Sequence, residues 1–192
     1  MKSFNIYARA LTLSACLALA GCSTPFKISY NFDWGERDEL HLAEDRAATL
    51  KIAREIIAGD PFMTLVTVDQ NGQPRARTVE HSVPDENMVI WISTIPGTRK
   101  LEQIKANPKV TLTFDNESET SYVTLMGKAT IHTDLETIQK KAWRSDQQRA
   151  LFWPDFPENY VLIKVEPKWI EVVAPSISSD EENWRPQAVT FD

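Results

Sequence analysis

A threonine and two basic residues, Thr98, Arg99 and Lys100, directly follow a Pro96-Gly97 turn. Pro-Gly is a turn dipeptide, and threonine is common at the start of a helix. Basic residues in the first helical turn are unfavourable, because the helix N-terminus already carries partial positive charge. They become favourable if an anion binds there, since free backbone N–H groups, a hydroxyl and two cations bind phosphate. The spacing therefore indicates either a phosphate site or a surface turn with two solvated cations.

The elements around this turn are mostly strands. Asn71-Gly72 is a hairpin signal between two strand-like runs, and Gly127 indicates a bulge or a close backbone approach inside a third. Helices do not alternate with strands, which disfavours a doubly wound α/β fold and favours a small antiparallel barrel of about six strands with helical caps. We predict strands over 62–68, 75–83, 88–94, 110–115 and 122–132, helices over 37–59, 134–143 and 145–152, and a closing hairpin of strands 161–165 and 169–173 around Pro167.

A longer motif contains the turn and resembles a known family. It runs Thr94-Ile-Pro-Gly-Thr-Arg-Lys100, then Gln103-Ile and Asn107-Pro108-Lys-Val110. This resembles the flavin-phosphate segment of the pyridoxamine 5'-phosphate oxidase-like proteins, and within them the general stress protein branch. The resemblance covers about residues 62 to 174. It implies a six-stranded antiparallel split barrel with helices, an α+β fold that binds FMN between two subunits.

The resemblance also implies which residues contact FMN. In the oxidase a lysine stands about five residues beyond the strand arginine, whereas Ser82 occupies that position here, and no C-terminal residues match those that hold pyridoxal phosphate. Vitamin B6 synthesis is therefore disfavoured. Tyr122 falls where the oxidase has a glutamine that reaches the cofactor of the other subunit, although a packing role is the alternative. The implied FMN contacts are Arg77, Thr78, Val79, Ser82, Ser93, Thr94, Thr98, Arg99, Lys100 and Tyr122.

Other catalytic chemistry has no motif in this chain. We find no Ser-His-Asp set, no HExxH, no paired cysteines and no Walker motif, and three scattered histidines indicate no metal site. If the protein is an enzyme, the cofactor carries the chemistry, as an FMN-dependent oxidoreductase acting on a small-molecule substrate or electron donor. The alternative is a non-catalytic split-barrel module that holds haem or another flat ligand, or a dimeric stress protein without FMN.

The N-terminal segment predicts export. Lys2 and Arg9 precede an apolar run that ends at Leu19-Ala-Gly-Cys22, which matches a bacterial lipoprotein box. We expect residues 1–22 to be the lipoprotein signal, with Cys22 lipidated; an ordinary signal peptide is the alternative. Ser23, which is not aspartate, indicates the outer membrane, facing the periplasm. We further expect a tether over 23–36, the split-barrel domain over 37–174 and a polar tail over 175–192, whose Trp184 and Arg185 could cover a ligand, dock on a partner or pack loosely.

The net charge and the size of the barrel restrict the partners. Without Lys2 and Arg9, 19 of the 21 basic residues remain against 27 acidic ones, which gives a net charge of −8. This argues against nucleic acid as a partner.

A small barrel is filled by its own side chains, so a flavin ring must lie outside it, where only a second subunit could bury its far side. We therefore expect a homodimer, formed by the sheet of residues 62–94 and the strand 122–132.

Overall fold

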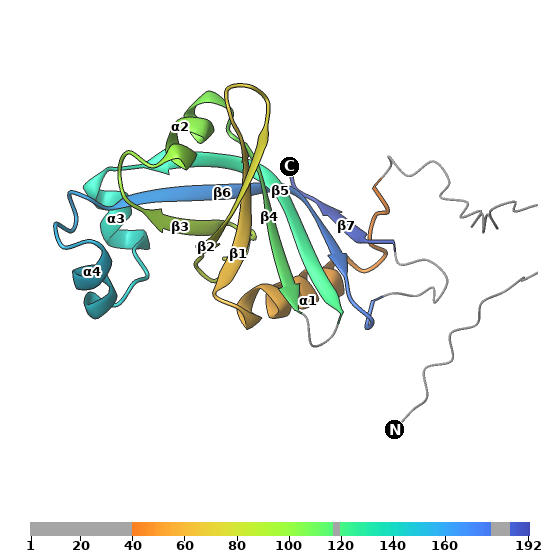
Figure 1. The fold of residues 1–192 in the computed structure, drawn as a ribbon. Coiled ribbons are helices and arrows are strands. Elements are labelled where there is room, and N and C mark those ends of the chain that lie inside the picture. The colour runs from red at the N-terminus through yellow and green to blue at the C-terminus, as the bar shows by residue number, and fades with distance from the viewer. Residues whose placement is uncertain (1–39, 117–119, 178–184) are drawn as a thin grey trace, which may run out of the picture. The chain divides into compact units, whose positions relative to one another are not determined.

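Seven strands form one antiparallel sheet in the computed structural model, which describes residues 40–116, 120–177 and 185–192 (Figure 1). The strands follow the order β2-β1-β4-β5-β6-β3. The short β7 pairs with the same edge of β6 as β3 does, but farther along the strand. The predicted signal and tether, with Cys22, lie outside the described residues. The strands are β1 Phe62–Val68, β2 Pro74–Glu80, β3 Ile90–Thr94, β4 Lys109–Asn116, β5 Ser121–His132, β6 Val161–Val173 and β7 Gln187–Thr190.

The sheet curves into a barrel that is split between its two end strands, β2 and β3. These strands share no ladder, but just beyond β2 the backbone N–H of Ser82 donates to the carbonyl of Trp91 at 2.9 Å. Together with the helices, this confirms the predicted fold class, an antiparallel split barrel of the α+β type. The described strands number seven rather than six, because the short β7 adds to the six on the main path.

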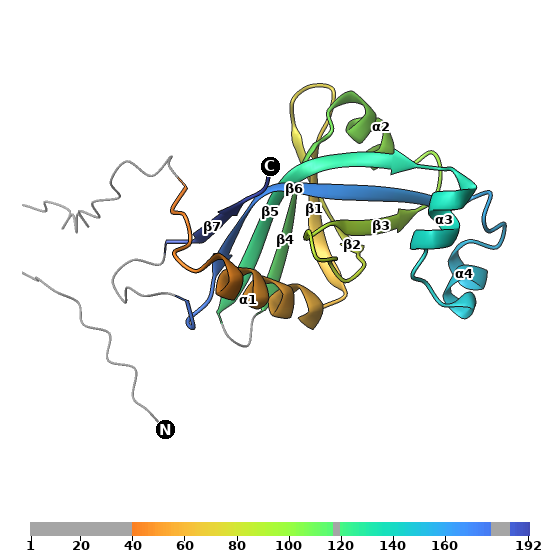
Figure 2. The same cartoon turned by 180° about the vertical axis from the view of Figure 1, so that it is seen from behind.

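Alternation along the strands builds the core. Met63, Leu65 and Thr67 of β1 are buried, whereas the residues between them are partly exposed. The same period of two continues across β4 and β5, so one face of the sheet is apolar and the other is not. Helix α1, Arg46–Gly59, closes this core with Ala53, Ile56 and Ile57. Figure 2 shows α1 lying across the ends of β4 and β5.

Helix α1 begins later than the predicted start at Arg37. Its N-cap is Asp45, whose carboxylate accepts a hydrogen bond from the N–H of Ala48. The residues before the cap pair with β7 instead: Ala188 donates to the carbonyl of His41 and accepts from the N–H of Ala43. The partner in this strand-like pairing, Ala188, lies in the predicted polar tail. The apolar spacing within residues 37–45 carries no sign of such a distant partner.

The predicted closing hairpin around Pro167 is wrong, because β6 runs through Pro167 as a single strand. On one side β6 pairs with β5 along its whole length; on the other it pairs with β3 before Pro167 and with β7 after it. Pro167 stands in the gap between these two partners, where its missing N–H costs no ladder bond. The prediction of a bulge or close approach at Gly127 is confirmed: the β5–β6 register shifts between Met126 and Gly127, and a Cβ atom at Gly127 would lie 2.4 Å from the backbone oxygen of Glu166.

Three short helices complete the fold. Helix α2, Arg99–Ala106, follows β3 and lies beside the β1–β2 hairpin (Figure 1). Helices α3, Leu135–Lys141, and α4, Asp146–Phe152, begin at the predicted positions, capped by Asp134 and by a Ser145–Gln148 capping box. They cover a second apolar cluster on the outer side of β3 and β6. None of the described helices has the length and apolarity needed to cross a membrane.

Candidate functional site

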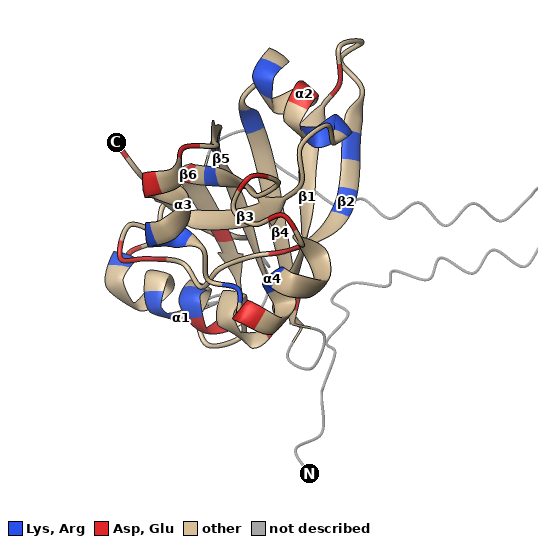
Figure 3. Ribbon diagram, turned by 90° about the vertical axis from the view of Figure 1, so that its left-hand side faces the viewer, with Lys and Arg blue, Asp and Glu red and all other residues tan. Residues whose placement is uncertain are grey.

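Strand β2 and the first turn of α2 bring four of the predicted site residues together. Arg77 lies on β2, Thr98 is the N-cap of α2, and Arg99 and Lys100 begin that helix, so basic positions of β2 and of α2, blue in Figure 3, lie close to each other. The positive charge of Arg99 acts on Arg77, and that of Arg77 acts on Lys100. Among the described residues, no ion pair joins an acid to any of these three cations. We call Arg77, Thr98, Arg99 and Lys100 the cationic cluster.

Neutral oxygens hold the Arg77 guanidinium. Its Nη1 donates to Thr67 Oγ1 at 2.6 Å, and its Nη2 donates to Gln103 Oε1 at 2.9 Å. Thr67 in turn donates to the same Gln103 oxygen at 2.6 Å. Neighbouring Arg75 differs, since it pairs with Asp69 at 3.1 Å. Sequence reasoning missed Thr67 and Gln103. Gln103 could have been found, because it lies three residues after Lys100 and four after Arg99, and this spacing places all three on one face of a helix.

The pKa values show that the cationic cluster holds charge at a cost. Burial lowers the pKa of Lys100, and the charge of Arg77 lowers it further. Burial also lowers the pKa of Arg77, with added effects from Arg99 and Arg75. Both shifts disfavour the charged form, because no neighbouring anion offsets the lost hydration. A bound anion would reverse them.

Thr98 is the N-cap of α2, but its side chain makes no capping hydrogen bond. Its Oγ1 is buried and has no hydrogen-bond partner among the described residues. A buried hydroxyl without a partner is uncommon and costs free energy. The first N–H groups of a helix lack partners in the preceding turn, and in α2 Leu101 donates to the carbonyl of Thr98, which leaves the N–H groups of Arg99 and Lys100. Thr98 and these N–H groups therefore form a set of donors at the cationic end of α2.

Ser93 and Thr94 end β3 beside this turn, and both are held by groups from the α3–α4 region. The carbonyl of Thr94 accepts from Trp153 Nε1 at 3.0 Å. Ser93 Oγ accepts from Nε of Arg144 at 3.3 Å. Arg144 is 8% exposed, forms an ion pair with Glu80 and stacks near Trp143 and Trp153. Sequence reasoning missed Arg144, because its partners are distant in the chain.

The remaining predicted residues lie outside the cationic cluster. Val79 packs against the core, and Ser82 Oγ accepts from the N–H of Trp91 at 3.0 Å. Thr78 points to the opposite, outward side of β2, where it lines a groove with Thr64 and Thr113. Tyr122 starts β5 opposite Asp115 and is 37% exposed.

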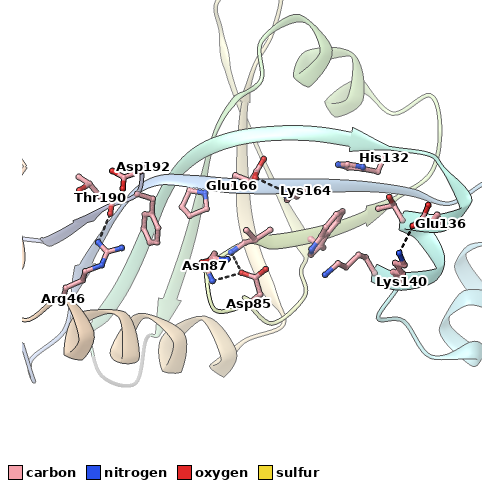
Figure 4. Close-up of a pocket in the computed structure, with 16 residues that line it drawn as sticks. Arg46, Asp85, Asn87, His132, Glu136, Lys140, Lys164, Glu166, Thr190 and Asp192 are labelled. Atoms are coloured by element: carbon pink, nitrogen blue, oxygen red, sulfur yellow. Dashed lines mark hydrogen bonds and ion pairs between the residues drawn. The ribbon is translucent and has the colours of Figure 1, made fainter.

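A separate groove of about 920 Å³ lies on the outer side of β3 and β6 (Figure 4). Two of its lysines are paired with acids, Lys140 with Glu136 at 2.6 Å and Lys164 with Glu166 at 2.8 Å, whereas Lys141 lies over the Trp91 ring, 5.8 Å from its centroid. Arg46 donates to the carbonyl of Thr190. The cationic cluster joins three cations that have no acidic partner among the described residues to a buried hydroxyl that has no hydrogen bond there, so it is the better candidate for a ligand site. The described part of the chain holds no group of three or more His, Cys, Asp or Glu side chains suited to a metal ion.

Comparison with known families agrees with this geometry. The family model for pyridoxamine 5'-phosphate oxidase matches residues 50–174, more than half of the chain. A pyridoxine/pyridoxamine 5'-phosphate oxidase of Escherichia fergusonii is 36% identical over 91 residues, which are 47% of this chain and 41% of that protein. The chain thus matches less than half of the length of this relative. The cationic cluster lies inside the region that the family model matches.

Solved structures share the fold. General stress protein 26 of Bacillus anthracis has a TM-score of 0.56 at 26% identity, covering 73% of this chain and 97% of that one. An FMN-binding protein of Nostoc punctiforme, related to pyridoxamine 5'-phosphate oxidase, has a TM-score of 0.56 at 16% identity, covering 79% and 98%. A haem-binding protein of Mycobacterium smegmatis has a TM-score of 0.57 at 17% identity, covering 76% and 59%. The last two similarities show the fold alone.

Proposed function

Because this chain belongs to the pyridoxamine 5'-phosphate oxidase family, we propose that it binds FMN and acts as a flavin-dependent oxidoreductase on a small molecule. The observation that carries the proposal is the cationic cluster, in which three cations lack an acid among the described residues and the Thr98 hydroxyl lacks a partner. The FMN-binding relative of the same fold supports the choice of flavin.

The residues present fit the phosphate of FMN. Arg77, Arg99 and Lys100 would offset its negative charge, and Thr98 Oγ1 would donate the hydrogen bond that it lacks. Burial of Arg77 and Lys100 strengthens this attraction, since charges interact more strongly away from water. Ser93 and Thr94, fixed through Arg144 and Trp153, would line the path from phosphate to ring.

Bound FMN would supply electron exchange with an organic substrate or a nicotinamide donor. The chain's own part would be to bind the phosphate and to orient the ring. Ser82, where the oxidase has lysine, gives no cation at the ring edge, and its Oγ already accepts from the Trp91 N–H. The proposed reaction is therefore not vitamin B6 synthesis but flavin chemistry on another small molecule.

We place the flavin ring between two copies of the chain. The outward face of β2, β1, β4 and β5 carries a row of threonines, in which Thr78 pairs with Thr64, Thr64 with Thr113, and Thr113 with Thr124. Phe62 on this face is 51% exposed, and Tyr122 is 37% exposed. Small side chains let a flat ring or a second sheet approach closely, and a two-fold axis would bring Tyr122 of each copy to the other site. A monomer in sedimentation that still binds FMN tightly would contradict this homodimer.

We also propose that the protein is a lipoprotein of the bacterial envelope, anchored at Cys22 in the outer membrane and facing the periplasm. The lipoprotein box at residues 19–22 supports this. Replacing Cys22 with Ser should abolish acylation and leave an uncleaved precursor, which mass spectrometry of the membrane fraction can measure. Wild-type chain free in the periplasm without acyl groups would contradict the anchor.

The visible absorption spectrum of the purified protein tests the cofactor. We expect a flavin spectrum after loading with FMN, and bleaching under NADH or NADPH without oxygen. A loaded protein that no donor reduces would be a flavin carrier rather than an enzyme. Failure to take up FMN, together with a Soret band after incubation with haem, would replace the proposal with a haem-binding module, the ligand of the Mycobacterium relative.

A further inference from the structure

Three elements meet at one neutral oxygen beside the cationic cluster. Gln103 Oε1, from α2, accepts from Arg77 Nη2 of β2 at 2.9 Å and from Thr67 Oγ1 of β1 at 2.6 Å. Thr67 also accepts from Arg77 Nη1, which closes a triangle of hydrogen bonds. Thr67 is completely buried, so its hydroxyl is fixed by the core of the barrel. The guanidinium of Arg77 therefore has a position determined by the packing of all three elements.

The side chain at position 103 is a neutral amide and not a carboxylate, which determines whether the charge of Arg77 is cancelled. A partly buried arginine is usually paired with an acid, and this chain does so for Arg75 through Asp69 at 3.1 Å. At Arg77 the acceptors are an amide oxygen, a hydroxyl and, at 3.4 Å, the backbone carbonyl of Leu65, which satisfy N–H groups without cancelling charge. A carboxylate in the same place would form an ion pair with Arg77 and repel a phosphate.

We infer that Gln103 is a positioning residue, which orients Arg77 toward the FMN phosphate while leaving its charge available. This inference rests on the proposed binding of FMN. It makes position 103 a determinant of selectivity for phosphorylated over unphosphorylated flavin. If Gln103 served only to attach α2 to the sheet, its replacement would affect both flavins equally.

The experiment compares three variants of the full chain purified in detergent. Gln103→Glu adds a negative charge with almost no change in shape, and Gln103→Leu removes the acceptor. Lys105→Gln makes the same change in net charge on the exposed side of α2, where Lys105 pairs with Glu102. Dissociation constants for FMN and riboflavin are measured by fluorescence quenching, and melting temperatures are measured without ligand.

We expect Gln103→Glu to weaken FMN binding by about tenfold or more, and riboflavin binding by less than about twofold. Gln103→Leu should weaken FMN binding by a smaller factor, because Arg77 keeps its charge but loses its orientation. Lys105→Gln should change neither constant by more than about twofold, since an exposed charge is screened. Equal losses for FMN and riboflavin, or no loss for FMN, would overturn the inference.

A wild-type chain that binds no FMN would refute the proposed function and the selectivity between flavins, but it would still leave a test of whether Gln103 keeps the charge of Arg77 available to an anion. In that case inorganic pyrophosphate serves as the probe of the cationic cluster. The melting temperature of the wild type should rise with pyrophosphate, and that of Gln103→Glu should not. Equal rises in both proteins would show that Gln103 does not control the charge of Arg77.

Discussion

The Lys100 ammonium lies near Arg77 in the folded chain, without an acidic partner among the described residues. Burial lowers its pKa, so the charged form is less favourable in the folded chain than in the unfolded one. For a base with a lowered pKa, this cost is present at neutral pH and disappears as pH rises above the unfolded value. The charge of Lys100 therefore does not stabilise the folded chain, and the proposed FMN phosphate would offset its cost.

Lys100→Ala should lower FMN affinity by about 1.5–3 kcal/mol, the range for a hydrogen bond to a charged group. Arg99→Ala should act in the same direction. Riboflavin affinity should hardly change, because riboflavin lacks the phosphate. Lys105→Ala on the same helix is the matched control, since Lys105 is exposed and pairs with Glu102. Calorimetric titration with both flavins measures the affinities of the wild type and of the three variants, and a matching loss for riboflavin would assign Lys100 to folding instead.

Removal of the Thr98 hydroxyl should have opposite effects on the stability of the unliganded chain and on its affinity for FMN. Thr98→Val keeps the shape but removes a buried oxygen without a partner. The unliganded chain should therefore be equally stable or more stable, and FMN affinity should fall by about 1 kcal/mol. Denaturant unfolding and FMN titration measure the two effects. A destabilised chain with unchanged FMN affinity would show that the hydroxyl serves the fold.

At the scale of the elements, the backbones of the paired strands β5 and β6 approach each other closely at Gly127. A Cβ atom at this position would lie 2.4 Å from the backbone oxygen of Glu166, which no side-chain rotation can relieve. Gly127→Ala should therefore lower the free energy of unfolding by about 2–3 kcal/mol. Gly59, at the end of α1, has nothing within 4 Å of its added Cβ, so Gly59→Ala should be neutral or gain up to about 1 kcal/mol. Urea midpoints of the two variants test the close approach, and similar midpoints would argue against it.

Strand β6 also carries a carboxyl group on the outward face of the sheet. Burial raises the pKa of Glu171 above its usual value of 4.5. For an acid with a raised pKa, the protonated form is favoured in the folded chain, so its contribution to stability is present at low pH and is lost as pH rises through the folded value. Glu171→Gln should therefore become more stable than the wild type as pH rises from 4 to 7. Unfolding midpoints across this range measure the difference, and a gap independent of pH would contradict it.

At the scale of the whole molecule, local patterns predicted most of the barrel, and long-range pairings explain the exceptions. Asn71-Gly72, Gly127 and the caps at Asp134 and Ser145 act on their immediate neighbours, so the sequence reveals them. The late start of α1 depends on pairing with Ala188, more than a hundred residues away. The continuity of β6 through Pro167 depends on which strands lie on its two sides. Neither is visible in a local pattern.

The candidate site follows the same division. Thr98, Arg99 and Lys100 are adjacent in sequence, so their spacing alone could indicate a phosphate site, although it also allowed a surface turn. Thr67, Gln103 and Arg144 act through partners on other elements, and only the folded chain shows that they hold Arg77 and Ser93. The supporting groups are therefore less predictable than the groups that would touch the ligand.

The central claim is that the cationic cluster binds the phosphate of FMN. Titration of the purified wild-type protein with FMN and with riboflavin, under the same buffer and salt, tests this most directly. We predict one FMN per chain, with an affinity at least about tenfold above that for riboflavin, a difference that added salt reduces. Equal affinities for the two flavins, or no binding of either, would contradict the account.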